Sequence, residues 1–133
     1  MVSEDRPGSL VVIEGIDSSG KKTQAKELVE KLEDCGEKVK YVEFPSYGDS
    51  ELGEVVSQFL RGEFGERSEL PVEVISMFYA MDRYQFRNEY EEFLSEGGVI
   101  VANRYSQSNI AFQSAEYEGQ EFDEIVEWLK RLE

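Results

Sequence analysis

Histidine is absent from this chain of 133 residues, and cysteine occurs only once. Without histidine, the chain can build neither a histidine-ligated metal site nor a catalytic histidine base. The single thiol, Cys35, cannot close an internal disulfide, which favours a reducing compartment, the cytoplasm. No apolar run approaches the length of a membrane span, and the N-terminus lacks a signal-peptide pattern. We therefore predict a cytoplasmic protein without a membrane partner.

Basic residues are also scarce, since 14 Lys and Arg stand against 29 Asp and Glu and give a net charge of −15. A general nucleic-acid surface needs a basic stripe, so we expect no nucleic-acid partner. Any anionic ligand must be held by local positive groups that act against the field of the entire protein. The acidity itself leaves two explanations open, namely solubility and a saline habitat.

Length and composition predict one domain. A chain of 133 residues with 40% hydrophobic content is long enough to bury a substantial core. Residues 1–8 are polar and contain Pro7-Gly8, so we predict a flexible tail there. Residues 9–133 are predicted to form the core, and they contain no internal repeat and no low-complexity linker.

A glycine-bounded loop follows the first apolar run of the chain. Residues 10–13 (LVVI) predict a buried strand, and apolar residues at 25, 28, 29 and 32 have the spacing of a helix. Gly15 and Gly20-Lys21 between them have the spacing of a phosphate-binding P-loop, in which backbone N–H groups and a lysine hold phosphate. The predicted ATP phosphate-binding residues are Gly15, Ser18, Ser19, Gly20, Lys21, Lys22 and Thr23. An ordinary turn between a strand and a helix is the alternative.

Further strands and helices alternate along the chain. We expect two further strands, at 38–44 and 99–102. We also expect a short helix from the N-cap Ser50 to near Gly62 and one long helix from Pro71 to Ser95. Another helix is expected to begin near Gln107, and a last helix to lie around 122–129. This order predicts a parallel α/β sheet. Ligands of such sheets gather beyond the C-terminal ends of the strands. Those ends are Asp17, residues 44–46 and residues 103–105, and we expect them to meet in one cleft.

Four segments in a fixed order carry a family resemblance. They are EGIDSSGKKTQ at 14–24, Phe44-Pro45 followed by SELG at 50–53, MFYAMDR at 77–83, and NRYSQSNIAFQ at 103–113. The first resembles EGxDGSGKTTQ, the third LLFAADR and the fourth DRYxxSNxAYQ of the thymidylate kinase (dTMP kinase) family of P-loop nucleoside monophosphate kinases. Order and spacing agree over about residues 9–115.

The resemblance implies an α/β P-loop NTPase three-layer fold, in which helices flank a parallel sheet of spatial order 2-3-1. It also implies a reaction of nucleotide biosynthesis, the transfer of the γ-phosphoryl group of ATP to dTMP, which gives dTDP. The implied catalytic residues are Lys21, Asp17 and Arg104. The implied dTMP-binding residues are Asp17, Phe44, Pro45, Tyr79, Arg83, Arg104, Asn109, Phe112 and Gln113. Mg²⁺ would accompany ATP with Asp17 as a weak ligand, and a homodimer is plausible by resemblance.

Each implied role has an ordinary structural alternative. By resemblance, Arg104 clamps the dTMP phosphate, Arg83 binds the thymine edge and Tyr79 stacks on the ring. Phe112 would crowd the 2′ position of the sugar, and Asn109 and Gln113 would meet the base. Tyr79 instead fits an apolar helical stripe, and the two arginines fit surface ion pairs. The amides at 109 and 113 fit a solvent-facing helix surface, and Asp17 fits a turn or a cap.

Four positions depart from the family pattern. Lys22 replaces the hydroxyl that binds the metal, and Asn103 replaces the aspartate of the DRY motif. Ser46 stands where many relatives carry an arginine, and Ser18 follows Asp17 where some carry a catalytic arginine. Because Mg²⁺ prefers oxygen ligands, our hypothesis is that Lys22 supplies part of the missing positive charge and that metal use is weakened.

The chain ends at Glu133, where relatives continue into a lid, an adenine-binding loop and two more strands. We expect either a fragment or a second chain that supplies the remainder, and a sheet edge left uncovered. On this view the chain binds dTMP but transfers phosphate poorly. Two alternatives stay open, a kinase for another monophosphate or deoxynucleoside, and a catalytically silent nucleotide-binding protein that acts through a partner.

Overall fold

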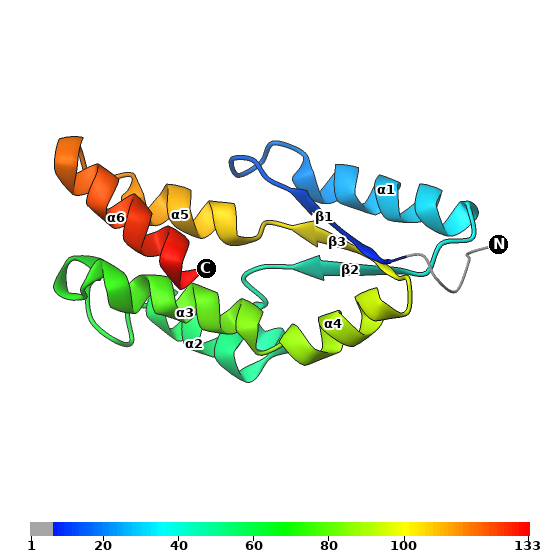
Figure 1. Cartoon of the computed structure of the whole chain (residues 1–133). Helices are drawn as coiled ribbons and strands as arrows, with labels where there is room; N and C mark the ends of the chain where they lie inside the picture. Colours follow the sequence, from blue (N-terminus) through cyan, green and yellow to red (C-terminus); the bar gives the residue numbers. More distant parts are fainter. Residues whose placement is uncertain (1–6) are drawn as a thin grey trace. The chain divides into compact units, whose positions relative to one another are not determined.

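The computed structural model describes residues 7–133 (Figure 1), and the chain forms two units. The first unit contains the described residues up to Phe44 together with Phe86–Tyr105, and the second contains Pro45–Gln85 and Ser106–Glu133. Most of the predicted tail, residues 1–6, lies outside the described residues. Gly8 donates its backbone N–H to the carbonyl of Leu94 at 3.0 Å.

Three parallel strands form the sheet of the first unit: β1 (Ser9–Ile13), β3 (Val99–Asn103) and β2 (Val39–Glu43). Their spatial order is β1-β3-β2, which confirms the predicted order. Every residue of β3 is buried, as expected for a central parallel strand. The prediction that residues 10–13 are buried is wrong: Leu10 is 41% exposed, and no residue of β1 reaches full burial. The strand pairs on one side only, so fewer neighbours cover it.

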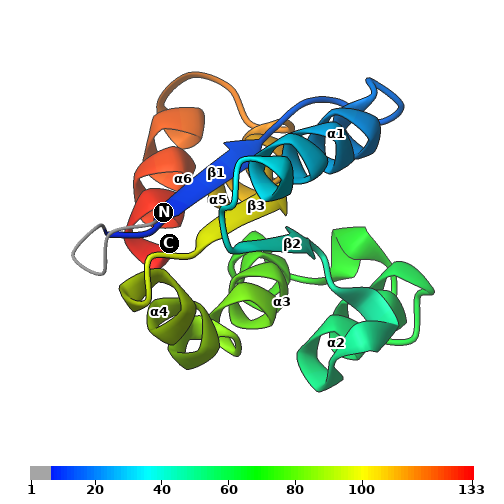
Figure 2. The ribbon, with the colours of Figure 1, turned by 90° about the vertical axis from the view of Figure 1, so that its right-hand side faces the viewer.

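Helices cover both faces of this sheet, which gives three layers (Figure 1 and Figure 2). Helix α1 (Lys21–Asp34) packs on the face that carries Val99 and Val101, with Ala25 fully buried. Helix α4 (Arg87–Ser95) packs on the opposite face. Successive residues of a strand point to opposite faces, so a continuous apolar run in β3 fills two cores. The predicted α/β fold class with a flanked parallel sheet is confirmed.

The single long helix predicted from Pro71 to Ser95 is wrong. The structure has α3 (Val72–Tyr84) and α4, interrupted at Gln85 and Phe86. The side-chain amide of Gln85 donates to the backbone carbonyl of Asp82 at 2.9 Å. In an unbroken helix that carbonyl would accept from the backbone N–H of Phe86, so a local side chain competes with the helical ladder.

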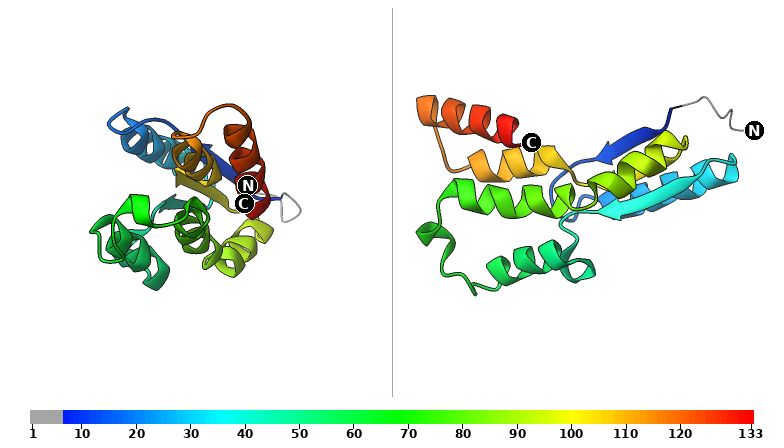
Figure 3. Two further views of the ribbon diagram at one scale, coloured as in Figure 1. Left: turned by 90° about the vertical axis from the view of Figure 1, so that its left-hand side faces the viewer. Right: turned by 60° about the horizontal axis from the view of Figure 1, so that its bottom comes forward.

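Helices form the second unit (Figure 3). They are the 3₁₀ helices η1 (Tyr47–Asp49) and η2 (Arg67–Glu69), then α2 (Glu51–Leu60), α3, α5 (Ser106–Ser114) and α6 (Gly119–Leu132). Helix α3 packs against α2 and α5, and α5 packs against α6. The predicted N-cap is confirmed, because Ser50 Oγ accepts from the backbone N–H of Gly53 at 2.9 Å.

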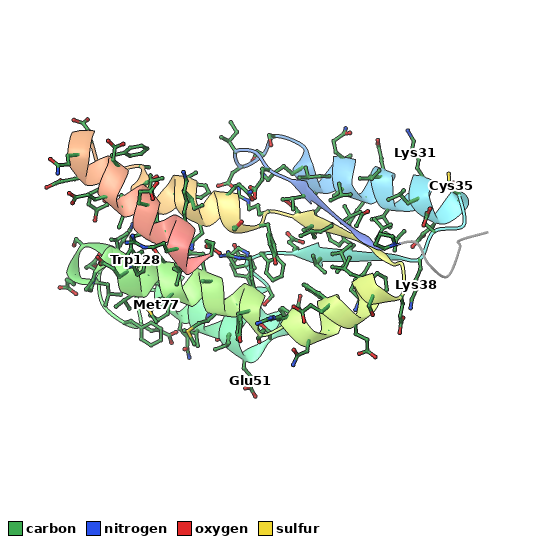
Figure 4. All side chains as sticks on the ribbon, viewed as in Figure 1. Lys31, Cys35, Lys38, Glu51, Met77 and Trp128 are labelled. Atoms are coloured by element: carbon green, nitrogen blue, oxygen red, sulfur yellow. The ribbon has the colours of Figure 1, made fainter. Side chains whose placement is uncertain are left out.

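Some apolar and reactive side chains stay at the surface of the units (Figure 4). Met77 on α3 is 44% exposed, and Cys35, which directly follows α1, is an exposed free thiol. Among the described residues, no helix is both long and apolar enough to cross a membrane.

Candidate functional site

The loop between β1 and α1 has the backbone of a phosphate-binding loop. Gly20 has φ 90° and caps α1, a left-handed conformation that glycine adopts without strain. A Cβ built on Gly15 would lie 3.0 Å from Ser19 Oγ, so the close approach there also favours glycine. Residues 14–20 are all exposed. The loop therefore presents its backbone and the N-terminus of α1 to anions.

Two side chains of the loop converge on one carbonyl. Ser19 Oγ donates to the Ile16 carbonyl at 2.7 Å, and Lys21 Nζ donates to the same oxygen. This contact places the ammonium group of the first residue of α1 over the loop. A phosphate oxygen is a stronger acceptor than a peptide carbonyl, so the same ammonium group is well placed to pair with a bound phosphate.

Arg104 joins the end of β3 to this loop. Its guanidinium pairs with Asp17 Oδ1, and its backbone N–H donates to the Ile13 carbonyl at 3.0 Å. The Arg104 side chain is 15% exposed, whereas that of Asp17 is 85% exposed. Arg104 has φ 70°, an uncommon conformation for a residue with a side chain and one that recurs at functional sites. Next to it, the Tyr105 N–H donates to Glu14 Oε1 at 2.7 Å.

Phe44, predicted to contact dTMP, belongs to an aromatic core. Its side chain is 4% exposed, and its ring lies 5.9 Å from Phe86, 6.3 Å from Tyr90 and 5.8 Å from Tyr105. The structure therefore brings Asp17, Arg104 and the loop together in the first unit, while Phe44 packs beneath the strand ends as a core residue.

Lys22 and Asn103 are the two residues that differ from the metal-binding positions of the family pattern. The polar groups around them do not form a magnesium site. Lys22 Nζ lies 4.0 Å from Glu43 Oε2 on the surface. Asn103 Nδ2 donates to the Tyr41 hydroxyl at 3.4 Å, and burial raises the pKa of that phenol. Asn103 Oδ1 is buried and has no partner among the described residues. These residues also contain no group of three acidic, histidine or cysteine side chains near enough to hold a metal. Within residues 7–133, the donor set therefore does not fit a dedicated Mg²⁺ site.

In the second unit, Arg83 and Asn109 share a carboxylate. The Arg83 guanidinium pairs with Glu133 Oε2, and Asn109 Nδ2 donates to Glu133 Oε1 at 2.7 Å. The side chains of Arg83 and Glu133 are 7% and 11% exposed. Family motifs predict Arg83 and Asn109 as site residues, whereas no motif contains Glu133. A glutamate at the end of an acidic helix gives no local signal that it turns inward.

Gln113 has a charged partner as well. Arg67 Nη2 donates to Gln113 Oε1 at 2.9 Å, and Gln113 is 3% exposed. Nearby, burial raises the pKa of the Tyr79 phenol, the neighbouring Tyr47 raises it further, and Arg67 lowers it. Arg67 was not predicted, because it lies in a polar connection without a motif. Two more predicted residues belong to this unit, Phe112, which is 48% exposed, and Pro45, which is partly buried.

A buried carboxylate organises the segment after Pro45. Asp82 is 1% exposed and accepts from the Ser46 N–H at 2.7 Å, from Ser46 Oγ at 2.5 Å and from Gln85 Nε2 at 2.9 Å. Ser46 Oγ also contacts Ser50 Oγ at 2.5 Å. Ser46, which stands in place of the family arginine, therefore has a structural partner in this chain.

Comparisons with known proteins agree with this geometry. The family model for thymidylate kinase matches residues 13–132. A thymidylate kinase of Plasmodium falciparum is 32% identical over 114 residues, which cover 86% of this chain and 52% of the relative. The Homo sapiens thymidylate kinase is 32% identical over 110 residues, covering 83% and 50%. A solved thymidylate kinase from Candida albicans matches with a TM-score of 0.77 at 26% identity, covering 95% and 57%. The chain spans about half the length of the curated relatives it matches.

Proposed function

Because the chain belongs to the thymidylate kinase family, we propose that it provides the phosphate-binding loop and the dTMP-binding residues of a dTMP kinase. The reaction transfers the γ-phosphoryl group of ATP to the 5′-phosphate of dTMP and yields dTDP and ADP. The observation that carries this proposal is the pairing of Arg104 with Asp17 on a loop that also holds Lys21. Two cationic side chains thus serve one exposed anion-binding loop, in a chain whose net charge is −15.

Lys21 and Arg104 would bind the phosphates of the two nucleotides. Phosphoryl transfer depends on positioning and on neutralising charge rather than on covalent catalysis. In our proposal Lys21 exchanges the Ile16 carbonyl for ATP phosphate oxygens. The pair with Asp17 keeps the Arg104 guanidinium oriented toward the phosphate of dTMP, and a guanidinium offers the paired donors that phosphate accepts.

Thymine would be recognised by residues that the family motifs supply. Arg83, Asn109 and Gln113 supply polar groups to the base edge, and the half-buried Tyr79 supplies an aromatic face. Sites of this composition suit a flat heterocycle with few polar atoms. Phe112 would restrict the sugar at its 2′ position.

Thymidylate kinases use ATP together with Mg²⁺. The part of the chain that the structure describes has no group of three acidic, histidine or cysteine side chains for the ion, and no step of the proposal passes through it. Lys22 instead adds positive charge next to Lys21 at the start of α1. The proposal also includes a cytoplasmic location and a homodimer, with ATP and dTMP as the small-molecule partners.

A second candidate is a catalytically silent nucleotide-binding protein that acts through a partner. It is favoured by Lys22 and Asn103, which stand at the two metal-site positions of the family pattern. A phosphotransfer assay with ATP and dTMP separates it from an active kinase. Binding of dTMP without formation of dTDP, at ATP and dTMP concentrations that saturate the protein, would favour the silent protein.

The first test is a calorimetric titration with dTMP, with UMP and dGMP as controls. We expect selective binding of dTMP, and loss of that binding in Arg83→Ala. The exposed Arg87, which forms an ion pair with Glu91 on α4, provides the matched control Arg87→Ala, which should bind like the natural chain. Equal binding of the three nucleotides would contradict a thymine site in this chain.

A further inference from the structure

Glu133 connects two residues of the proposed base site through a single carboxylate. One oxygen pairs with Arg83 and the other accepts from Asn109 Nδ2 at 2.7 Å. We propose that Glu133 is a positioning residue that fixes the orientation of the Asn109 amide, and thereby makes the site select a keto-pyrimidine over an amino-pyrimidine. This inference rests on the proposed function and adds to it the determinant of base selectivity.

The partners of Asn109 leave one orientation of its amide. Nδ2 faces two groups, the Ser76 carbonyl at 3.1 Å and the Glu133 carboxylate, and both groups only accept hydrogen bonds. A flipped amide would place its oxygen against these two acceptors and lose both bonds. Because the carboxylate is charged, its bond to Nδ2 is the stronger of the two. Glu133 therefore holds the amide nitrogen inward.

The oxygen of the Asn109 amide accepts no hydrogen bond from the described residues. Asn109 is 4% exposed, and its Oδ1 is buried without a partner among the described residues. A buried acceptor without a donor is unfavourable, so a ligand that displaces the covering side chains and donates to Oδ1 recovers that free energy. The Arg83 guanidinium beside Glu133 offers only donors.

An acceptor next to a donor matches one class of pyrimidine. Thymine and uracil present an N3–H donor beside the O4 acceptor, which is the complement of Asn109 Oδ1 and Arg83. Cytosine presents an N4 amine beside an N3 lone pair, which would place donor against donor and acceptor against acceptor. A site with fixed polar groups discriminates strongly against a ligand that leaves those groups unpaired. The selectivity thus depends on Glu133 through Asn109.

The test compares dTMP, dUMP and dCMP by calorimetric titration of the natural chain and three variants. In Glu133→Ala we expect the preference for dTMP and dUMP over dCMP to fall by about tenfold or more, the change that corresponds to ~1.4 kcal/mol. Glu133→Gln keeps one acceptor oxygen but turns an NH₂ group toward Arg83 or Asn109, so we expect a preference between those of the natural chain and Glu133→Ala. Glu127→Ala removes an exposed glutamate from α6, the helix that Glu133 directly follows, and should change nothing.

The outcomes separate this inference from the proposed function. Parallel weakening of all three nucleotides in Glu133→Ala, or an unchanged preference, would overturn the positioning role and leave the proposed function intact. A natural chain that binds dTMP and dCMP equally would overturn both. Should Glu133→Ala not fold, as judged by circular dichroism, Glu133→Asp provides the same comparison, because it keeps the charge and withdraws the carboxylate by one methylene.

Discussion

Individual side chains at the loop show how this chain departs from its family pattern. Lys22 and Asn103 occupy the positions of a metal-binding hydroxyl and a carboxylate. In the structure, Lys22 lies near Glu43, and Asn103 keeps a buried oxygen without a partner among the described residues. A lysine repels a cation that a hydroxyl would bind, and a neutral amide attracts Mg²⁺ less than a carboxylate does. Metal dependence is therefore the property in which we expect this protein to differ most from relatives.

Restoring the family residues should strengthen the use of Mg²⁺. In the double variant Lys22→Thr with Asn103→Asp, we expect Mg²⁺ to increase ATP affinity by about tenfold more than it does in the natural chain, or ~1.4 kcal/mol. Titrations of ATP with and without Mg²⁺ measure this factor. Lys26→Thr, an exposed lysine on α1, serves as the control for loss of one charge. An identical magnesium effect in the natural chain and the double variant would contradict the idea.

Because Tyr79 is partly buried, the ionisation of its phenol makes the stability of the protein depend on pH. Burial raises its pKa above the ordinary value of about 10, so the folded state favours the protonated phenol. Below the pKa that the Tyr79 phenol has in the unfolded chain, its contribution to the free energy of unfolding is fully present. Above it the unfolded phenol ionises first, and stability is lost as the pH rises toward the folded pKa. We expect the free energy of unfolding to fall less steeply above about pH 10 in Tyr79→Phe than in the natural chain.

Urea unfolding between about pH 8 and pH 11 checks this difference. The pKa of Tyr41 is also raised by burial, so part of the decline persists in Tyr79→Phe. Equal slopes in the two proteins would mean that Tyr79 ionises alike in the folded and unfolded states.

Among the structural elements, local patterns predicted the strands, the family resemblance implied their spatial order, and non-local contacts explain the failed predictions. Short apolar runs identified β1, β2 and β3, and the spacing of glycine and lysine identified the loop before α1. At the helix break, Gln85 donates to Asp82, and the Asp82 carboxylate accepts from Ser46, which is far away in sequence. For the same reason Glu133 and Arg67 could not be predicted from the sequence, since each contacts a predicted site residue that is far away along the chain. Arg83, Asn109 and Gln113 were predicted as site residues only because the family motifs contain them.

The Asp82 network gives a prediction for the stability of the second unit. In Asp82→Asn one acceptor oxygen is replaced by an NH₂ group, which faces donors from Ser46 or Gln85. Buried donors without acceptors destabilise, so we expect unfolding to become easier by ~1–3 kcal/mol. Denaturant unfolding measures the change, and Asp123→Asn, an exposed residue of α6, is the matched control. Equal midpoints for Asp82→Asn and the natural chain would show that the network contributes nothing to stability.

At the level of the entire protein, the net charge of −15 repels nucleotides, which are themselves anionic. The few cations at the loop act locally, whereas the acidic surface acts over longer distances. Raising salt from about 0.01 M to about 0.1 M shortens the screening length from about 30 Å to about 10 Å, so the long-range repulsion fades first. We therefore expect the association rate of dTMP to rise with salt over this range.

Stopped-flow mixing with a fluorescent dTMP analogue measures the rate, and the uncharged nucleoside thymidine provides the control. A rate for dTMP that falls with salt would show that the local cations govern the encounter. In that case the acidic surface would have no part in nucleotide binding, and the explanation of the acidity would have to lie elsewhere, in solubility or habitat.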